Sequence, residues 1–182
     1  ICAVLRAGDV VARLEGGGFA VALAPVRRLE LEALVQLASR LQSAVSVPVN
    51  LDASKLYVTC SIGFCHSVNA PDLSGASLLN AAQIAADEAR RRGPNAIRAY
   101  SADMARSRAI RESLRADLER ALEEGQIRPH FQPQTETFSG EITGFEALAR
   151  WYHPEKGLIP PAEFLPLIED AGMEDRLGEV IL

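Results

Sequence analysis

The stretch Phe145-Glu146-Ala147-Leu148-Ala149-Arg150-Trp151 alternates in the manner of a β-strand. Its aromatic and alanine side chains fall on one face, and Glu146, Leu148 and Arg150 fall on the other. A glutamate suits a hard metal cation and an arginine suits phosphate oxygens, so this face predicts a site where a metal ion and a phosphate bind side by side. The stretch alone leaves an alternative open, which is a half-buried strand with an ordinary surface ion pair.

The residues around this strand form a spaced frame. They are Phe131-Gln132-Pro133 upstream and, downstream, Trp151-Tyr152-His153-Pro154, Gly157, Pro160-Pro161, Phe164 and Ile168-Glu169. With this frame, the chain from residue 114 onward resembles the start of EAL domains, the cyclic di-GMP phosphodiesterases with a TIM-barrel fold. The resemblance implies that Glu146 binds a metal ion and that the residues contacting cyclic di-GMP are Gln132, Glu146, Leu148 and Arg150.

The reaction that this resemblance implies is hydrolysis of one phosphodiester of cyclic di-GMP, with water activated by Mg2+ or Mn2+. A TIM barrel needs roughly 250 residues, far more than follow residue 114. We therefore expect about two strands of a parallel barrel, a scaffold role for Pro161 and Glu169, and neither a complete catalytic site nor a bound metal in this chain. We also expect apolar side chains to be partly uncovered, namely Phe145, Trp151, Phe164, Leu165 and Leu167.

A second motif lies near the N-terminus. Two short β-favouring runs, 10–14 and 19–23, flank Glu15-Gly16-Gly17-Gly18, which predicts a β-hairpin. The segment 13–19, together with 58–63 and 89–95, resembles GGDEF domains, the diguanylate cyclases, whose hairpin carries R-x-G-G-D-E-F. This resemblance covers roughly residues 1–104.

The cyclase motif of this hairpin is degenerate. Glu15 replaces the first glycine, Gly17 and Gly18 replace the acidic pair, and Gly16 and Phe19 are retained. The resemblance implies that the acidic pair helps to hold Mg2+ and to activate the attacking hydroxyl on GTP. Glycine offers no carboxylate for either task, so we expect no cyclase activity and interpret the segment as a glycine-rich turn.

The segment Arg6-Ala7-Gly8-Asp9 has the spacing of the R-x-x-D inhibitory site of GGDEF domains, which the resemblance implies binds cyclic di-GMP. Arginine presents a planar fork of donors to phosphate or guanine, and aspartate accepts hydrogen bonds from guanine N–H groups. The alternative is a helix-end Arg6 paired with a strand-start Asp9.

The remaining pattern predicts an α/β (α+β) fold. Apolar periodicity predicts the end of a helix at 1–7, helices at 28–43 and 77–92, strands at 57–64 and 97–100, and a long helix at 101–124. We expect a partial GGDEF domain at 1–104, with a ferredoxin-type sheet and helices. A helical linker at 105–124 then acts as a rigid spacer, and 125–182 forms the first βα part of an EAL TIM barrel.

Composition limits the partners. The net charge of −5 gives no global basic field, so we expect no nucleic-acid partner. Of the three cysteines, Cys60 and Cys65 lie in an apolar strand-like run, which predicts buried thiols in a reducing cytoplasm. No run of about 18 apolar residues is present. The chain begins without methionine, which indicates a piece of a longer protein, and a membrane anchor upstream stays open.

These observations together predict a tandem GGDEF–EAL signalling protein. The parent is expected to hydrolyse cyclic di-GMP through its EAL domain, with a non-catalytic regulatory GGDEF domain, whereas this piece is expected to be inactive. Two alternatives remain: a catalytically silent receptor for cyclic di-GMP or GTP that acts through partner proteins, and an interaction module that binds no nucleotide. A homodimer would cover the open barrel surfaces.

Overall fold

The computed structural model describes residues 1–26, 29–51 and 54–181. The chain forms two compact units, Ile1–Arg106 and Ser107–Leu182, each with helices and strands. This mixed architecture agrees with the predicted α/β class. The two units are described separately below.

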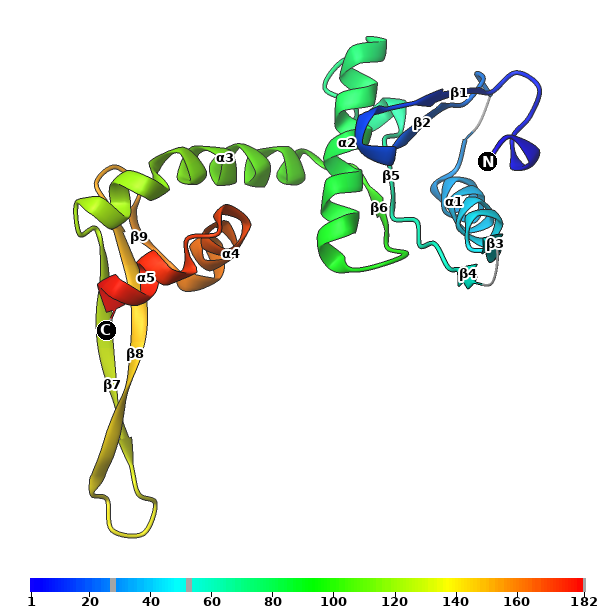
Figure 1. Cartoon of the computed structure of the whole chain (residues 1–182). Helices are drawn as coiled ribbons and strands as arrows, with labels where there is room; N and C mark the ends of the chain where they lie inside the picture. Colours follow the sequence, from blue (N-terminus) through cyan, green and yellow to red (C-terminus); the bar gives the residue numbers. More distant parts are fainter. Residues whose placement is uncertain (27–28, 52–53, 182) are drawn as a thin grey trace. The chain divides into compact units, whose positions relative to one another are not determined.

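The first unit contains three two-stranded sheets and two complete helices among its described residues. Its elements, labelled in Figure 1, are the 3-10 turns η1 (Cys2–Val4), η2 (Glu15–Gly17) and η3 (Ser67–Asn69), the strands β1 (Val10–Arg13), β2 (Phe19–Ala22), β3 (Val49–Leu51), β4 (Ser54–Leu56), β5 (Ile62–Phe64) and β6 (Ile97–Ala99), and the helices α1 (Leu31–Val45) and α2 (Gly75–Arg92).

The hairpin predicted around the glycine run is present. Strands β1 and β2 are antiparallel, with Arg13 opposite Phe19. The Leu14 N–H donates to the Gly18 carbonyl over 2.8 Å and closes the turn. Gly16 and Gly17 have φ values of 69° and 79°, which residues with a side chain rarely adopt. The glycines therefore shape the loop, as the sequence indicates.

The core of the first unit lies where α2 crosses the parallel pair β5–β6. Helix α2 contributes Ala81, Ile84 and Ala85, which cluster with Tyr100. A Cβ at Gly63 of β5 would overlap the backbone of Ala85 and Ala86. A glycine is therefore needed where this strand meets the helix.

The strand predicted at 57–64 is shorter than expected, because only Ile62–Phe64 is a strand. The backbone of Cys60 bonds to side chains instead of to a neighbouring strand. Its N–H donates to the Asn95 side-chain oxygen over 2.9 Å, and its carbonyl accepts from Gln42 over 2.9 Å.

Other predicted elements are shifted or shorter. The helix end expected at 1–7 is only the turn η1, and the hairpin β3–β4 was not predicted. Helix α1 runs over Leu31–Val45, whereas its predicted start at Arg28 lies outside the described residues.

The second unit combines the later part of a long helix with a three-stranded sheet. Its elements are α3 (Ala102–Glu123), which begins within the first unit, β7 (Ile127–Thr135), β8 (Ile142–His153), β9 (Gly157–Ile159), α4 (Pro161–Ala171) and α5 (Glu174–Ile181). The sheet order is β7-β8-β9, and both pairs are antiparallel. The expectation of a parallel strand pair is therefore wrong. The connections 136–141 and 154–156 are too short for the crossover that parallel neighbours require.

Trp151 is central to the core of the second unit. It is fully buried, and its ring meets Phe164 of α4 edge-on at 5.8 Å. The second half of α3 belongs to the same core through Leu114, Leu118, Ala121 and Leu122. Trp151, Phe164 and Leu167 are thus buried, contrary to the expectation that they would be uncovered, because α3 and α4 cover this part of the sheet. Phe145 is 62% exposed, as expected.

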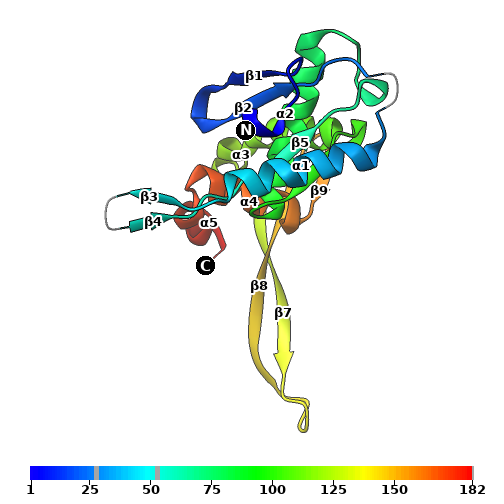
Figure 2. The same cartoon turned by 90° about the vertical axis from the view of Figure 1, so that its right-hand side faces the viewer.

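The strands β7 and β8 extend as a long twisted hairpin beyond α4 and α5 (Figures 1 and 2). The ladder pairs Gln134 with Gly144 and then Thr135 with Ile142, so Thr143 is an extra, bulged residue. On this arm Phe131 and Phe145 are each 62% exposed, and Phe138 at the tip is fully exposed.

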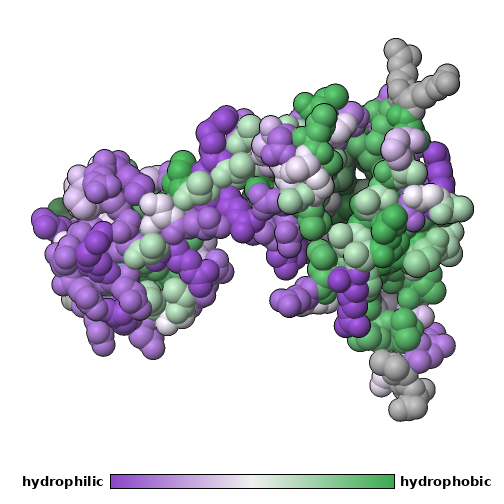
Figure 3. Space-filling model, turned by 90° about the horizontal axis from the view of Figure 1, so that it is seen from above, coloured by the Kyte–Doolittle hydropathy of each residue, from purple (hydrophilic) through white to green (hydrophobic). Residues whose placement is uncertain are grey.

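Large apolar side chains also reach the surface of the first unit, where Figure 3 shows them in green. They include Val10, Phe19, Leu31 and Val68. Among the described residues, no helix combines the length and the hydropathy that a membrane crossing requires.

Candidate functional site

The arm β7–β8 brings the predicted EAL-type residues onto one face. In the ladder, Gln132 lies directly opposite Glu146, and His130 lies opposite Leu148. Because side chains alternate along a strand, Arg150 shares this face with Glu146 and Leu148. The four predicted residues, which come from two separate segments of sequence, therefore lie on one face of the arm, with Gln132 directly opposite Glu146.

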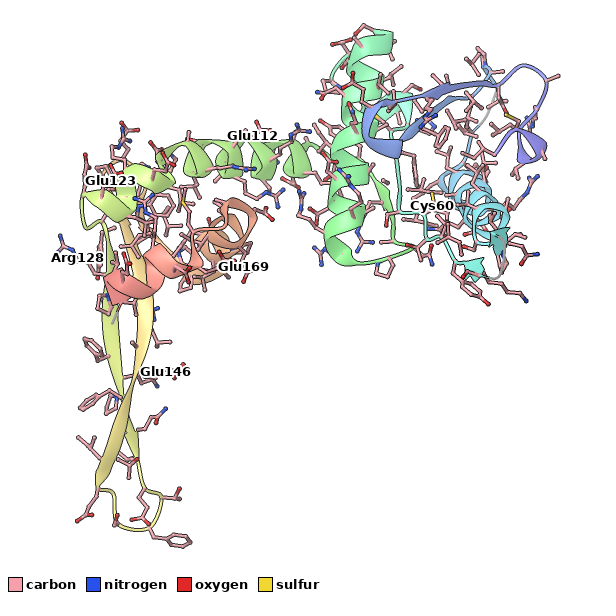
Figure 4. The ribbon with its side chains drawn as sticks, viewed as in Figure 1. Cys60, Glu112, Glu123, Arg128, Glu146 and Glu169 are labelled. Atoms are coloured by element: carbon pink, nitrogen blue, oxygen red, sulfur yellow. The ribbon has the colours of Figure 1, made fainter. Side chains whose placement is uncertain are left out.

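The two charged residues of this face differ in environment. Glu146 is exposed and lies on the part of the arm beyond the helices, as Figure 4 shows. Arg150 is half-buried, and its Nη1 donates to the carbonyl of Ala149 over 2.8 Å. Arg128, opposite Arg150, donates through Nε to the Gly125 carbonyl over 2.9 Å. The face thus presents one carboxylate beside two guanidinium groups.

The donor set for a divalent metal is sparse. Within the described residues, no three His, Cys, Asp or Glu side chains lie close enough to hold one ion. A Mg2+ or Mn2+ site takes about six ligands, including one or two carboxylates, substrate oxygens and waters. Glu146 fits as one such ligand, but the residues of this chain do not form a metal centre by themselves.

Two further polar residues of this face were not predicted as part of the site. Nε2 of His130 lies 2.6 Å from the hydroxyl oxygen of Tyr152, and the centres of the two rings are 5.9 Å apart. Tyr152 follows Glu146, Leu148 and Arg150 at a spacing of two. The alternation that identified those three residues, continued by one step, would have found it.

In the first unit, Arg6 and Asp9 lie together at the end of the β1–β2 hairpin. Asp9 accepts from the Ala24 N–H and the Arg6 N–H, each over 2.9 Å. The hydrogen bond from Ala24 is the largest of the causes that lower the pKa of Asp9 below its usual value. The hydrogen bond from Arg6 and the positive charge of its side chain lower this pKa further. Both carboxylate oxygens of Asp9 thus accept hydrogen bonds from backbone N–H groups. The Arg6 guanidinium has no ion-pair partner among the described residues.

A cavity of about 440 Å³ adjoins this pair. Its walls are mostly apolar and come from η1, the end of β2 and helix α1. Its charged residues are Arg6, Asp9 and Arg40. Arg40 also donates to the Val4 carbonyl over 3.3 Å. A cavity that combines apolar side chains with two arginines suits a flat anionic ligand.

The degenerate cyclase hairpin carries no carboxylate at the two positions where GGDEF domains have acids. Gly16 and Gly17 have open space where a Cβ would stand. Glu15 is exposed in the turn, one residue before Gly16. This hairpin therefore offers only one acidic side chain, Glu15, and Gly16 separates it from the two acidic positions, which Gly17 and Gly18 occupy.

Comparison with protein families divides the chain in the same order. Residues 1–96 match the family described as diguanylate cyclase, GGDEF domain. Residues 115–182 match the EAL domain. The EAL match begins inside α3, next to the buried Leu114.

Curated relatives include cyclic di-GMP enzymes. The chain is 32% identical over its whole length to the bifunctional diguanylate cyclase/cyclic di-GMP phosphodiesterase MucR of Pseudomonas aeruginosa, covering 26% of that protein. It is also 34% identical over its whole length to the cyclic di-GMP phosphodiesterase NbdA of the same organism, covering 23%. The chain thus spans about a quarter of the length of these curated relatives. Among solved structures, the GGDEF domain of TpbB (YfiN) from P. aeruginosa is similar, with a TM-score of 0.53 and 29% identity, covering 58% of this chain and 60% of that one.

Proposed function

Because this chain belongs to the GGDEF family and continues into an EAL domain, we propose that it serves cyclic di-GMP signalling, with a regulatory GGDEF domain that has lost cyclase activity. The EAL part supplies the first residues of a cyclic di-GMP phosphodiesterase site. The observation that carries this proposal is the ladder pairing of Gln132 with Glu146, which places both on the face of Arg150.

Each residue of this face has a chemical task in the proposal. Glu146 provides one metal ligand, Arg150 binds a phosphate of the dinucleotide, and the Gln132 amide bonds to it as well. Leu148 packs beneath the ligand. A bound Mg2+ or Mn2+ would activate water and stabilise charge on phosphorus. Since one carboxylate does not form a metal centre, we derive no hydrolytic step from this chain alone.

Loss of cyclase activity in the GGDEF part is proposed on the chemistry of its turn. With Gly17 and Gly18 at the acidic positions, no carboxylate neutralises Mg2+ or takes a proton from the ribose hydroxyl. The proposed regulatory domain spans 1–104, a helical linker spans 105–124, and the EAL part spans 125–182. Cytoplasmic placement, GTP binding and a homodimer belong to the same proposal.

A second candidate is a catalytically silent receptor that binds cyclic di-GMP through Arg6 and Asp9. The cavity beside this pair favours it, because Arg6 and Arg40 are both at its wall. In this candidate Arg6 binds phosphate or guanine, whereas Asp9 holds the loop through its two backbone hydrogen bonds.

Calorimetric titration of the chain with cyclic di-GMP, with and without Mn2+, tests both candidates. Because Glu146 would share a metal ion with oxygens of the nucleotide and with water, metal-dependent binding requires the nucleotide to complete the coordination. In that case we expect Glu146→Ala to weaken the binding about ten- to hundredfold, the effect of losing one charge-assisted contact. Glu141→Ala, at an exposed position of the same arm, is the matched control.

The receptor candidate predicts a different pattern. Binding would then survive in Glu146→Ala and be lost in Arg6→Ala, whereas Arg13→Ala, an exposed arginine of the same hairpin, would leave it unchanged. Equal and metal-independent behaviour of all four variants would contradict both candidates and favour an interaction module without nucleotide.

A further inference from the structure

Helix α3 contributes to the cores of both units. In its first turns Met104 and Ala105 pack against the cluster around Tyr100. From Leu114 onward it is part of the core around Trp151. No glycine or proline interrupts it from Ala102 to Glu123. The contacts between its second half and the sheet of the second unit decide how a displacement of the helix is transmitted to that sheet.

One buried histidine provides such a connection. His153, at the end of β8, is only 4% exposed. Its Nδ1 accepts the N–H groups of Glu155 and Lys156 over 3.1 and 3.2 Å. The ring proton is therefore on Nε2, which lies 3.2 Å from Oδ2 of Asp117 on α3 and donates to it. Asp117 thus selects the tautomer that leaves Nδ1 free to hold the turn.

The surroundings of Asp117 keep its carboxylate charged. The hydrogen bond from His153, followed by the charges of Arg120 and Lys156, lowers the pKa of Asp117 against the opposing effect of desolvation. Arg120 lies 2.5 Å from Oδ1, and the Lys156 ammonium lies 3.9 Å from Oδ2. Lys156 also donates to Ser113 of α3 over 3.1 Å, which ties the same turn to the same helix a second time.

The turn held by His153 sets the end of strand β8. It joins β8 to β9, whose ladder pairs His153 with Gly157 and Trp151 with Ile159. The His153 ring also contacts Trp151 at 5.5 Å between ring centres. Arg150 precedes this segment directly, so the register fixed here continues into the face of Glu146 and Arg150.

We propose that Asp117 and His153 are a positioning pair that sets the end of β8 from helix α3, so that displacement of α3 alters the face carrying Glu146 and Arg150. The helix side of the pair is the Asp117 carboxylate, and the strand side is the buried His153 ring, whose Nε2 donates to it. The importance of that face for signalling rests on the proposed function, whereas the mechanical link rests only on these contacts.

Amide hydrogen exchange followed by NMR, without nucleotide, tests this link. We expect Asp117→Ala to speed exchange at residues 145–156 about ten- to hundredfold, as expected when a buried donor loses a charged partner. Asp117→Asn retains an acceptor and should restore most of the protection. Glu119→Ala, an exposed position on the same helix, should change nothing.

Three outcomes would overturn the proposal. Faster exchange of similar size at Leu167 and Ile168 of α4 would show general destabilisation. Unchanged exchange at 145–156 would show no positioning. A His153 ring with its proton on Nδ1, read from side-chain nitrogen shifts, would contradict the assigned tautomer. The nucleotide titration is independent, so either experiment can fail alone.

Discussion

The glycine at position 63 has the most restrictive surroundings of any described glycine. A Cβ there overlaps backbone atoms of Ala85 and Ala86 rather than a flexible side chain. We expect Gly63→Ala to lower the free energy of unfolding of the first unit by about 3 kcal/mol or more, at the upper end of overpacking effects. Urea unfolding followed by circular dichroism measures this.

Gly75 in α2 provides the matched control, because nothing lies within 4 Å of its Cβ position. Gly75→Ala should leave the free energy of unfolding unchanged or raise it by up to about 1 kcal/mol. Equal effects of the two substitutions would contradict the close approach of β5 to α2.

The lowered pKa of Asp9 predicts a pH dependence at the same scale. A carboxyl whose folded pKa is depressed stabilises the fold above its unfolded pKa of about 3.9 and loses this contribution as pH falls through the folded value. We therefore expect Asp9→Asn to lower Tm at pH 7 and the difference from wild type to shrink as the pH falls below about 4. Scanning calorimetry at pH 7, 4 and 3 checks this. Glu32→Gln, at an exposed carboxylate of α1, is the matched control.

At the scale of elements, two prolines protect the outer edge of β7. Pro129 pairs with Ala149 and Pro133 with Phe145. Proline has no N–H to give, and alternate residues of a strand present their backbone groups to opposite edges. The backbone groups of residues 129, 131 and 133 therefore point away from β8, toward the outer edge of β7. Of these three residues, only Phe131 has an N–H that can donate at this edge. The edge of this exposed arm is poorly suited to adding another strand.

Replacing both prolines should remove this protection. We expect Pro129→Thr with Pro133→Thr to shift the chain toward larger species in sedimentation velocity, because it restores two outward donors. Gln132→Thr with Gln134→Thr adds the same side chains at positions whose N–H groups face β8, and should not. Similar sedimentation of both variants would contradict the assigned orientation of the strand.

Helix α3 shows how far its own sequence predicts an element. The absence of glycine and proline over 101–124 predicted a helix, and α3 spans Ala102–Glu123. It was predicted to be a rigid spacer at 105–124, whereas its second half is part of a core through the buried Leu114 and Leu118. The apolar spacing of these leucines was a signal for burial, but the surface that covers them comes from β7, β8 and α4.

At the scale of the whole molecule, the two cores should unfold as separate transitions. The only tryptophan, Trp151, is fully buried in the second unit and reports on that unit alone. We expect Leu118→Ala to lower the midpoint seen by tryptophan fluorescence, at a cost of about 2–5 kcal/mol, and Gly63→Ala to leave that midpoint unchanged. Ile110→Ala, at a position 48% exposed on the same helix, should have little effect. A single transition that all three variants shift alike would contradict independent cores.

Local sequence patterns predicted many of the helices and the first hairpin. They did not predict which distant strands pair with each other. The glycine run predicted the β1–β2 hairpin because positive φ values are a local property. The segment 57–61 has strand-like composition, but Gln42 and Asn95 take the backbone groups of Cys60. The antiparallel pairing of β7 with β8 was missed although Gly140 marks a turn between two β-rich runs. Motif spacing supplied the residues of the candidate face, and only the ladder shows that Gln132 lies opposite Glu146.

The extra residue Thr143 interrupts the alternation of side chains between the two faces of the arm, so the alternation at the tip is shifted by one residue from that at the base. Without it, strict alternation would turn Ile142 toward the side of Glu146. With it, Ile142 pairs with Thr135 and joins Phe145 on the opposite side. The orientation of Glu146 is therefore set by regular alternation from the buried pair Ile127 and Trp151 in the core. Insertions or deletions within 136–141 should not change the orientation of the Glu146 side chain. The tip can therefore vary in length and composition while the residues of the binding face point in the same direction.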